Sequence, residues 1–296
     1  MQWVALILWL VLSWDIGLAG AGDVAASDIG VVTQLKGDVR VLREQGHYEL
    51  ALGVDVRVGD IVTTGEGESS VQLEMKDGSL LAIGSRSKLY LSTYTLDHKQ
   101  QVVDAEVSLI MGWLRFFTAK LQPDRTYQVV TPSLTAGIRG TEGVFLATSE
   151  ITQFVLEDGQ AILTEIDPNG VKTVLESLNS GYFAEQRNGQ RLAIRKAIKE
   201  SPFQDAFPLL MRQRLQRHLP DLKAHGIVPR YLHDWQRDDF ALLLAHPQVF
   251  HRIKQQFHSN SRWRQKLLLF LKRHPDVKPL DFKQKMQQRS RHSLAE

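Results

Sequence analysis

Residues 131–145 read TPSLTAGIRGTEGVF, and this stretch sets the expectation for the fold of the chain around it. It joins two alternating apolar runs, YQVV just before it and VFLA beginning at its end. Between the two runs lie three closely spaced glycines, Gly137, Gly140 and Gly143. Glycines at this density allow positive φ and a close approach of two backbones. The stretch therefore predicts a crossing point of strands inside a β-rich domain.

One charged residue, Arg139, stands in the middle of this apolar and glycine-rich stretch. A charged side chain among apolar neighbours must either reach solvent or find a partner. Two interpretations of Arg139 stay open at this point: a buried pin that fixes the shape of the crossing, or a recognition group. In the second interpretation, Arg139 and the nearby Thr141 are candidate binding residues.

From residue 29 to residue 193 the hydrophobic pattern has a period close to two. Runs such as SVQLEM, SLLAI, TYQVV and TQFVLE are short and rich in β-branched or aromatic residues, which is typical of strands. Turn signals separate them, among them Asp77-Gly78 and Asp158-Gly159, and Asp-Gly favours tight hairpins. A dozen short strands without helical patterns between them predict an all-β domain: an antiparallel sandwich, a roll or a short β-solenoid.

Several short motifs follow one another along this region: Gly37-Asp38-Val39, the run VGDIVTTG at 58–65, Asp77-Gly78-Ser79, Gly112-Trp113-Leu114-Arg115, the IRGT of residues 138–141 and LEDGQA at 156–161. In this order and spacing they resemble a known bacterial envelope module, the FecR domain. The resemblance covers about residues 30–185. It implies an envelope location and a part in signalling or binding, and it carries over no catalytic residue.

The N-terminus has the pattern of an export signal. Residues 3–14, WVALILWLVLSW, are apolar, and a helix of that length spans about 18 Å of a hydrocarbon core of roughly 30 Å. Ala19-x-Ala21 follows as a small-residue cleavage site. We therefore predict a signal peptide over residues 1–21 and a periplasmic protein, with an uncleaved inner-membrane anchor as the alternative.

After residue 195 the pattern changes to a helical one. Asp238-Asp239 precede FALLLAH, and Ser261 precedes RWRQKLLLFLKRH, as capping residues do at helix starts. His218, His246 and His274 are 28 residues apart, as are Trp235 and Trp263, and Phe240 and Leu268. The sequence therefore predicts an all-α C-terminal domain of short helices over residues 200–283, with a 28-residue repeat. A frayed tail is expected over residues 284–296.

Charge is divided unevenly along the chain. Residues 195–296 hold 21 of the 36 basic and 9 of the 33 acidic residues, a net charge of +12, which leaves −9 for residues 1–194. The basic face attracts polyanions. Its candidate binding residues are Arg252, Arg262, Arg264, Lys272 and Arg273. An exported protein would meet anionic lipids or anionic envelope polymers there, and no nucleic acid is expected; an inert solvated face is the alternative.

Signals for catalysis and for metal binding are missing from the sequence. The chain has no cysteine, no Gly-x-Ser-x-Gly and no phosphate-binding loop, and aspartates beside glycine are typical of turns. The three spaced histidines lack the His-x-x-x-His pairing of one helical face, so they are expected at helix boundaries rather than on a metal. We predict no enzyme, no cofactor and no metal. An envelope carbohydrate hydrolase is the distant alternative.

The sequence thus favours an exported, non-enzymatic binding or scaffold protein. Its FecR-like domain is expected to contact an envelope protein or a glycan, and its basic region an anionic partner. FecR-like signalling proteins carry a cytoplasmic segment before their membrane span, whereas two residues precede Trp3 here. The alternative is a sensor component that relays an envelope signal to a separate membrane partner or to a sigma-factor regulator.

Overall fold

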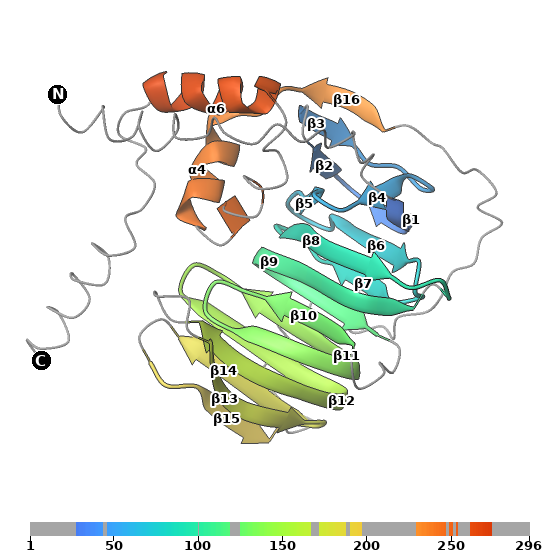
Figure 1. The fold of residues 1–296 in the computed structure, drawn as a ribbon, viewed down its shortest axis with the longest axis vertical. Coiled ribbons are helices and arrows are strands. Elements are labelled where there is room, and N and C mark those ends of the chain that lie inside the picture. Colours follow the sequence, from blue (N-terminus) through green and yellow to red (C-terminus); the bar gives the residue numbers. More distant parts are fainter. Residues whose placement is uncertain are drawn as a thin grey trace, which may run out of the picture.

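The computed structural model describes residues 28–43, 46–99, 101–118, 125–166, 172–187, 190–196, 229–246, 249–250, 253 and 261–273. Within these ranges sixteen strands join in one connected sheet, and two helices lie at one end of it (Figure 1). The strands of the first half are β1 (Asp28–Lys36), β2 (Val39–Arg43), β3 (Gly46–Glu49), β4 (Asp55–Arg57), β5 (Ile61–Thr64), β6 (Ser70–Met75), β7 (Leu80–Ile83) and β8 (Lys88–Leu96). The second half comprises β9 (Val102–Phe117), β10 (Thr126–Val130), β11 (Thr135–Ala147), β12 (Ile151–Ile166), β13 (Lys172–Asn179), β14 (Tyr182–Arg187), β15 (Ala193–Lys196), β16 (Arg230–His233), α4 (Arg237–Ala245) and α6 (Ser261–Arg273).

The long strand β9 connects two branches of the sheet. Its first part pairs with β8 and, in parallel, with β10, whereas its last six residues pair with β11 and the last four of these also pair with β7. Gly112 stands where the partners change, with φ of +94°. A Cβ on Gly112 would lie 2.2 Å from Ser87 Oγ, and the same hydroxyl accepts the Trp113 N–H at 2.8 Å. Glycine at this position therefore lets β9 bend from one branch into the other.

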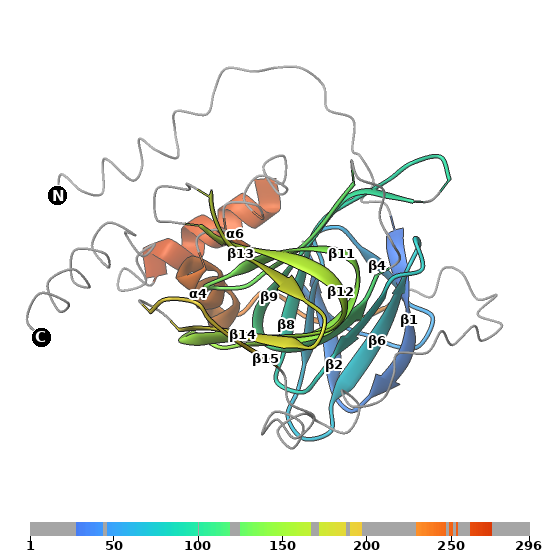
Figure 2. The ribbon, with the colours of Figure 1, turned by 90° about the horizontal axis from the view of Figure 1, so that it is seen from below.

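Strands β11 and β12 change partners in the same manner. The start of β11 pairs with β10 and its end with β9, while β12 pairs first with β14 and then with β13. Viewed along the stack of strands, the sheet curves back on itself around its core (Figure 2). Most of the predicted crossing at residues 131–145 thus lies in β11, a strand that belongs to both branches. Residues 29–193 are β-rich, as predicted for the first domain.

The main core lies between the branches. Phe145 and Phe154 stack with ring centroids 4.1 Å apart and planes 6° from parallel, and Phe116 packs on both rings. Gly143 leaves room for them, because a Cβ there would lie 2.9 Å from the Phe154 ring and 3.2 Å from that of Phe116. These close-packed aromatic rings bury a large apolar area at the crossing.

The predicted all-α C-terminal domain is wrong. Residues 230–233 form strand β16, which pairs antiparallel with β3 and extends the main sheet. Helices α4 and α6 do begin near the predicted capping residues, but their apolar side chains join a core cluster with residues of β2, β5, β8 and β9. The helical pattern showed an apolar face without showing that the face of a sheet would cover it.

The predicted 28-residue repeat is not supported. Phe240 is 4% exposed, whereas Leu268, which the repeat makes its equivalent, is 45% exposed. The predicted repeat residues His218 and His274 lie outside the described residues, as do the predicted signal peptide and tail. In the described ranges, no helix is both long enough and apolar enough to cross a membrane.

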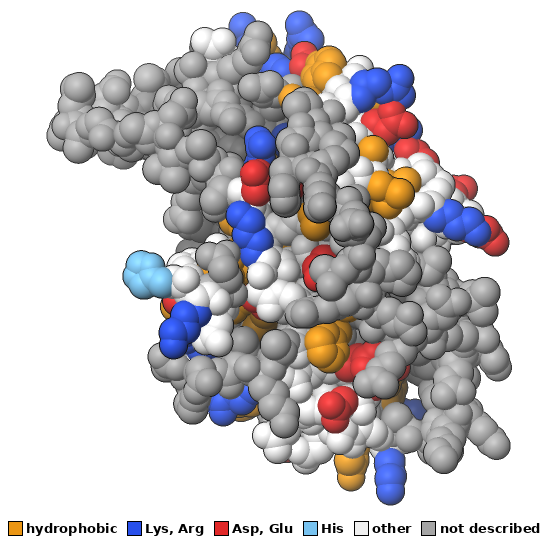
Figure 3. All heavy atoms as spheres, turned by 90° about the vertical axis from the view of Figure 1, so that its right-hand side faces the viewer, with side chains coloured by type: hydrophobic (Ala, Val, Ile, Leu, Met, Phe, Trp, Pro, Cys, Tyr) orange, Lys and Arg blue, Asp and Glu red, His pale blue; other side chains and the backbone are white. Residues whose placement is uncertain are grey.

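The side of the molecule on the right of Figure 1 bears mixed side chains. The described hydrophobic residues on this side, drawn in orange, lie singly among charged residues rather than in one patch (Figure 3). Scattered apolar residues of this kind are ordinary on a protein surface.

Candidate functional site

The glycine-rich crossing contains a bulge between Arg139 and Glu142 of β11. Gly140 has φ of +58° there. Thr141 is 1% exposed, and its backbone N–H donates to Thr118 Oγ1 at 3.2 Å while its carbonyl accepts the Thr118 N–H at 2.9 Å. The bulge therefore fixes the backbone of Thr141 in the interior.

Arg139 points away from the core at this bulge. It pairs in register with Gln160 of β12, which pairs with Asn179 of β13, and all three side chains are exposed. Directly paired residues of antiparallel strands lie on one face. The adjacent row is buried, with Ile138, Ala161 and Leu178 at 3%, 1% and 0% exposure. Arg139 is thus not a buried pin; it is part of an open, polar row.

A second row beside the first adds aliphatic surface. Gly137 pairs with Ile162, which pairs with Ser177, and the side chain of Ile162 is 53% exposed. A Cβ on Gly137 would have one neighbour within 4 Å, the Ile162 carbonyl oxygen at 3.8 Å, so this position is open on its outer side. We call the two rows the Arg139 face, defined by Gly137, Arg139, Gln160, Ile162, Ser177 and Asn179.

The sequence indicated Arg139 as a candidate binding residue but did not indicate that Gln160 and Asn179 lie beside it. Gln160 and Asn179 carried no separate signal, because each is one polar residue in an alternating strand. Alternation predicts that such residues point outward, but it does not show which strands pair or in which register. The register of β11, β12 and β13 is what gathers the six residues.

An ion cluster lies on the other side of the bulge. Arg115 of β9 donates to Glu142 Oε1 at 2.8 Å and to Glu157 Oε2 at 2.5 Å, with its own side chain 7% exposed. Burial and the charge of Glu142 raise the pKa of Glu157 by more than the charge of Arg115 lowers it, so the pKa is raised overall. One arginine thus holds two carboxylates from neighbouring strands, which is a means of fixing their arrangement.

The aspartates beside glycine serve the backbone and nearby side chains, as the sequence predicted for turn residues. Asp77 accepts the Ser79 N–H at 3.0 Å and the Tyr94 hydroxyl at 2.5 Å. Asp60 is 2% exposed and binds Arg43 through two N–H···O bonds of 2.8 and 3.0 Å. Burial raises the pKa of Asp60 in spite of the Arg43 charge.

The basic candidates of the C-terminal region are not gathered with Arg139. Lys272 and Arg273 are exposed in the last turn of α6, which Figure 1 places at the end of the sheet with β16, several strands away from β11. Arg262 and Arg264 belong to the first turns of α6, and Arg252 lies outside the described residues. Lys266 of the same helix pairs with Asp234 at 2.8 Å.

Among the described residues, no group of three or more His, Cys, Asp or Glu side chains is placed to hold a metal ion. The predicted absence of a cofactor and of catalysis stays a prediction.

One comparison with known proteins, that with protein-family models, agrees with the FecR-like motifs along the sheet. Residues 60–162 match the family model described as FecR protein. No curated protein matches the chain. Two crystal structures of a proposed anti-sigma factor from Parabacteroides distasonis share 13% identity each, with TM-scores of 0.39 and 0.36, and the match covers 46% and 45% of this chain. The chain spans 59% and 57% of those two chains, less than two thirds of either.

A further structure, described as a cell surface anchoring domain, shares 35% identity over 21% of this chain and 82% of its own, with a TM-score of 0.20. Scores at this level do not establish a shared fold. The match to the family model is the comparison that bears on the chain. It begins at the buried Asp60 and ends at Ile162 of the Arg139 face, and it spans the crossing. The chain is therefore a β-rich protein that carries a FecR domain over residues 60–162.

Proposed function

We propose that this chain is a non-enzymatic component of envelope signalling or regulation, and that its FecR domain binds a partner protein through the Arg139 face. The FecR match supports the signalling or regulatory role. The observation that carries the binding role is the in-register row of exposed Arg139, Gln160 and Asn179 on adjacent strands.

The chemistry of this face favours a protein partner over a glycan. A guanidinium and two amides offer planar donors and acceptors that match carboxylates and peptide groups. Ile162 at 53% and the nearby Val174 of β13 at 67% exposure offer aliphatic surface beside them. These aliphatic side chains can pack against apolar side chains of a protein partner, and the six residues that define the face include no aromatic ring on which a sugar could stack.

A photo-crosslinking residue at position 160 tests this proposal in cells. We expect a discrete crosslinked protein species that disappears when Arg139→Ala is added. The same label at Thr95, an exposed residue of β8, is the matched control. Cosedimentation of the purified chain with cell-wall sacculi tests the glycan alternative. If position 160 gives no Arg139-dependent protein species, the proposal is wrong, and Arg139-dependent cosedimentation would replace it with a glycan contact.

The proposal includes export and a second, electrostatic contact. The predicted signal peptide at residues 1–21 would deliver the chain to the periplasm, and N-terminal sequencing of the mature protein checks this. The exposed Lys272 and Arg273 would bind anionic lipid or polymer. Binding to vesicles with an anionic lipid should fall steeply as salt rises, and Lys272→Gln/Arg273→Gln should weaken it; equal binding to neutral vesicles would exclude the electrostatic contact.

A further inference from the structure

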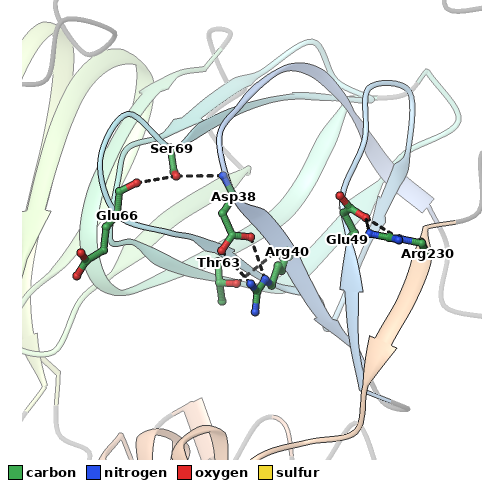
Figure 4. Close-up of polar contacts among 7 residues, drawn as sticks. All are labelled: Asp38, Arg40, Glu49, Thr63, Glu66, Ser69 and Arg230. Carbon is green, nitrogen blue, oxygen red and sulfur yellow. Dashed lines mark hydrogen bonds and ion pairs between the residues drawn. The ribbon is translucent and has the colours of Figure 1, made fainter.

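The edge of strand β3 is covered by a segment almost two hundred residues away in the sequence. Tyr231 of β16 pairs with Tyr48, and their rings meet edge to face at 5.5 Å. Arg230 donates from Nε to Glu49 Oε2 at 2.7 Å (Figure 4). Gly46 allows the close approach, because a Cβ there would lie 2.4 Å from the His233 carbonyl oxygen. Backbone pairing and side-chain contacts therefore both hold β16 against the edge of β3.

A tryptophan fixes the segment just beyond this strand. Trp235 is 8% exposed, and its indole N–H donates to the Arg43 carbonyl oxygen at 2.8 Å. The Trp235 ring packs 5.2 Å from Phe240. Both belong to a cluster with residues of the sheet, Leu42, Ile61, Tyr90 and Ile110. A buried tryptophan with a bonded indole is typical of an anchor in a recognition site.

A buried polar contact completes the attachment. His47 Nε2 lies 2.7 Å from Asp239 Oδ2, and the two residues are 7% and 8% exposed. The same Asp239 oxygen accepts the Gln236 N–H at 2.7 Å, so it caps the start of α4 while it meets the sheet. The ring of His233 lies 4.5 Å from that of His47. One carboxylate thus sets both the helix start and its position on β3.

The covering strand itself is weakly held. β16 has four residues, each exposed or half-buried, and its register with β3 shifts between Tyr231 and His233. The Arg230–Glu49 pair is exposed, and exposed pairs add little stability. Strand β3, in contrast, is part of the main sheet, because it pairs with β2, which pairs in turn with β5, and β5 with β8.

We propose that the β3 edge is an acceptor site for an extended polypeptide segment, that residues 229–246 occupy it in cis, and that a partner protein segment of the same chemistry binds when they are displaced. Strand addition to a sheet edge is a general mode of peptide recognition. The matching segment has a basic residue opposite Glu49, then an aromatic residue opposite Tyr48. A tryptophan follows at the fifth position after the basic residue, and a carboxylate at the start of a helix faces His47.

The cis segment makes this site hard to detect in the intact chain. A tethered segment competes intramolecularly with a free one, at an effective concentration that its linker sets. A free peptide therefore binds well only when the cis segment is weakened. The site lies on the β3 edge, and β2, β5, β8 and β9 separate it in the sheet from the strands that carry the Arg139 face.

A labelled synthetic peptide of residues 229–246 is the probe, tested on the full chain by fluorescence anisotropy. Trp235→Ala in the protein should raise peptide affinity roughly tenfold or more, because it removes the anchor of the competing segment. Asp239→Ala, which also alters only the cis segment, is the second loosened variant. A peptide that itself carries Trp235→Ala should bind neither the Trp235→Ala protein nor the Asp239→Ala protein.

A disulfide lock gives the decisive control, because the chain has no cysteine of its own. In the Trp235→Ala background, Tyr48→Cys/Tyr231→Cys joins residues that pair across β3 and β16. Oxidation should abolish peptide binding and reduction should restore it, whereas a Thr95→Cys/Asp104→Cys lock between β8 and β9 should have no effect. If folded Trp235→Ala and Asp239→Ala proteins both fail to bind the peptide, or if the oxidised β3–β16 lock still binds it, the proposal is wrong.

Discussion

Gly159 of β12 lies so close to Gly140 of β11 that a Cβ on Gly159 would stand 2.5 Å from the Gly140 carbonyl oxygen. The same Cβ would stand 2.6 Å from Thr141 Cγ2, and Gly159 has φ of +91°. Both glycines thus have positive φ on facing strands at the point where β11 bulges. The crossing depends on this contact, because no side chain fits between the two backbones.

Gly159→Ala should therefore destabilise the protein strongly. We expect a loss of about 2–4 kcal/mol, since the substitution combines an unfavourable φ with a clash against backbone that cannot move freely. Chemical denaturation measures it. Gly181→Ala is the matched control: it has φ of +81° with no atom within 4 Å of its Cβ, so it should lose about 1 kcal/mol. Equal losses for the two variants would contradict the close approach.

Asp60→Asn should be costly because it leaves a buried arginine charge without its carboxylate. Removing one partner of a buried pair typically costs about 3–5 kcal/mol, and Arg43 and Asp60 side chains are 13% and 3% exposed. The double variant Arg43→Met/Asp60→Leu should lose less than Asp60→Asn. Glu68→Gln, which removes the exposed pair with Lys36, should leave the denaturation midpoint unchanged. A neutral Asp60→Asn would contradict the assignment.

The sequence predicted the β-rich part of the fold because its signals are local. Alternation placed strands, and the glycines at 137, 140 and 143 indicated a crossing where β11 does bulge and change partners. It failed on the C-terminal region because the helical pattern of α4 shows an apolar face but not its partner. That partner is supplied by Leu42 and Ile61, far away in the sequence.

The candidate site was predictable to a smaller extent. Arg139 stood out as one charge among apolar residues, and alternation with the buried Ile138 places it outward, but the strands that lie beside it follow from long-range pairing. The contact of His47 with Asp239 spans 192 residues and carries no motif, so sequence reasoning could not find it. Long-range register decides both cases.

Two buried tyrosines should respond oppositely to loss of their hydroxyl. Tyr94 donates to Asp77 at 2.5 Å, so Tyr94→Phe should cost about 1–2 kcal/mol. The hydroxyl of Tyr127 is buried without a hydrogen-bond partner among the described residues, so Tyr127→Phe should be neutral or stabilising by about 1 kcal/mol. Thermal denaturation checks that Tyr94→Phe is less stable than wild type and that Tyr127→Phe is not. Destabilisation by Tyr127→Phe would show that its hydroxyl has a partner.

The same tyrosines predict a loss of stability in alkali. Burial raises the pKa of Tyr127 well above 10, and burial, together with the charges of Tyr127 and Asp77, raises that of Tyr94. The folded protein keeps both protons at a pH where the unfolded chain releases them, so unfolding is favoured above about pH 10. The free energy of unfolding should fall there with increasing pH, and less steeply in Tyr127→Phe. Absorbance titration of tyrosinate checks this: the difference between wild type and Tyr127→Phe should show that Tyr127 ionises only on unfolding.

Glu157 should make stability depend on pH in the acidic range. Burial and the charge of Glu142 raise its pKa above 4.5 despite Arg115, so the folded protein binds this proton more tightly than the unfolded chain does. The stability that Glu157 contributes is present below the pKa that it has in the unfolded chain, and it is lost as pH rises through its pKa in the folded protein. Glu157→Gln, which mimics the protonated form, should therefore be more stable than wild type at pH 7, with the difference shrinking toward pH 4.

Glu185 provides a control of the opposite sign. Burial raises its pKa, but hydrogen bonds from Gln153 and Arg187 outweigh burial and lower the pKa overall. Its contribution is present above the unfolded pKa and is lost as pH falls through the folded one. Glu185→Gln should thus be less stable than wild type at pH 7, and this difference should also shrink in acid. If Glu157→Gln is instead less stable than wild type at pH 7, as Glu185→Gln should be, then Arg115 stabilises the ionised Glu157 by more than burial destabilises it, which contradicts the raised pKa.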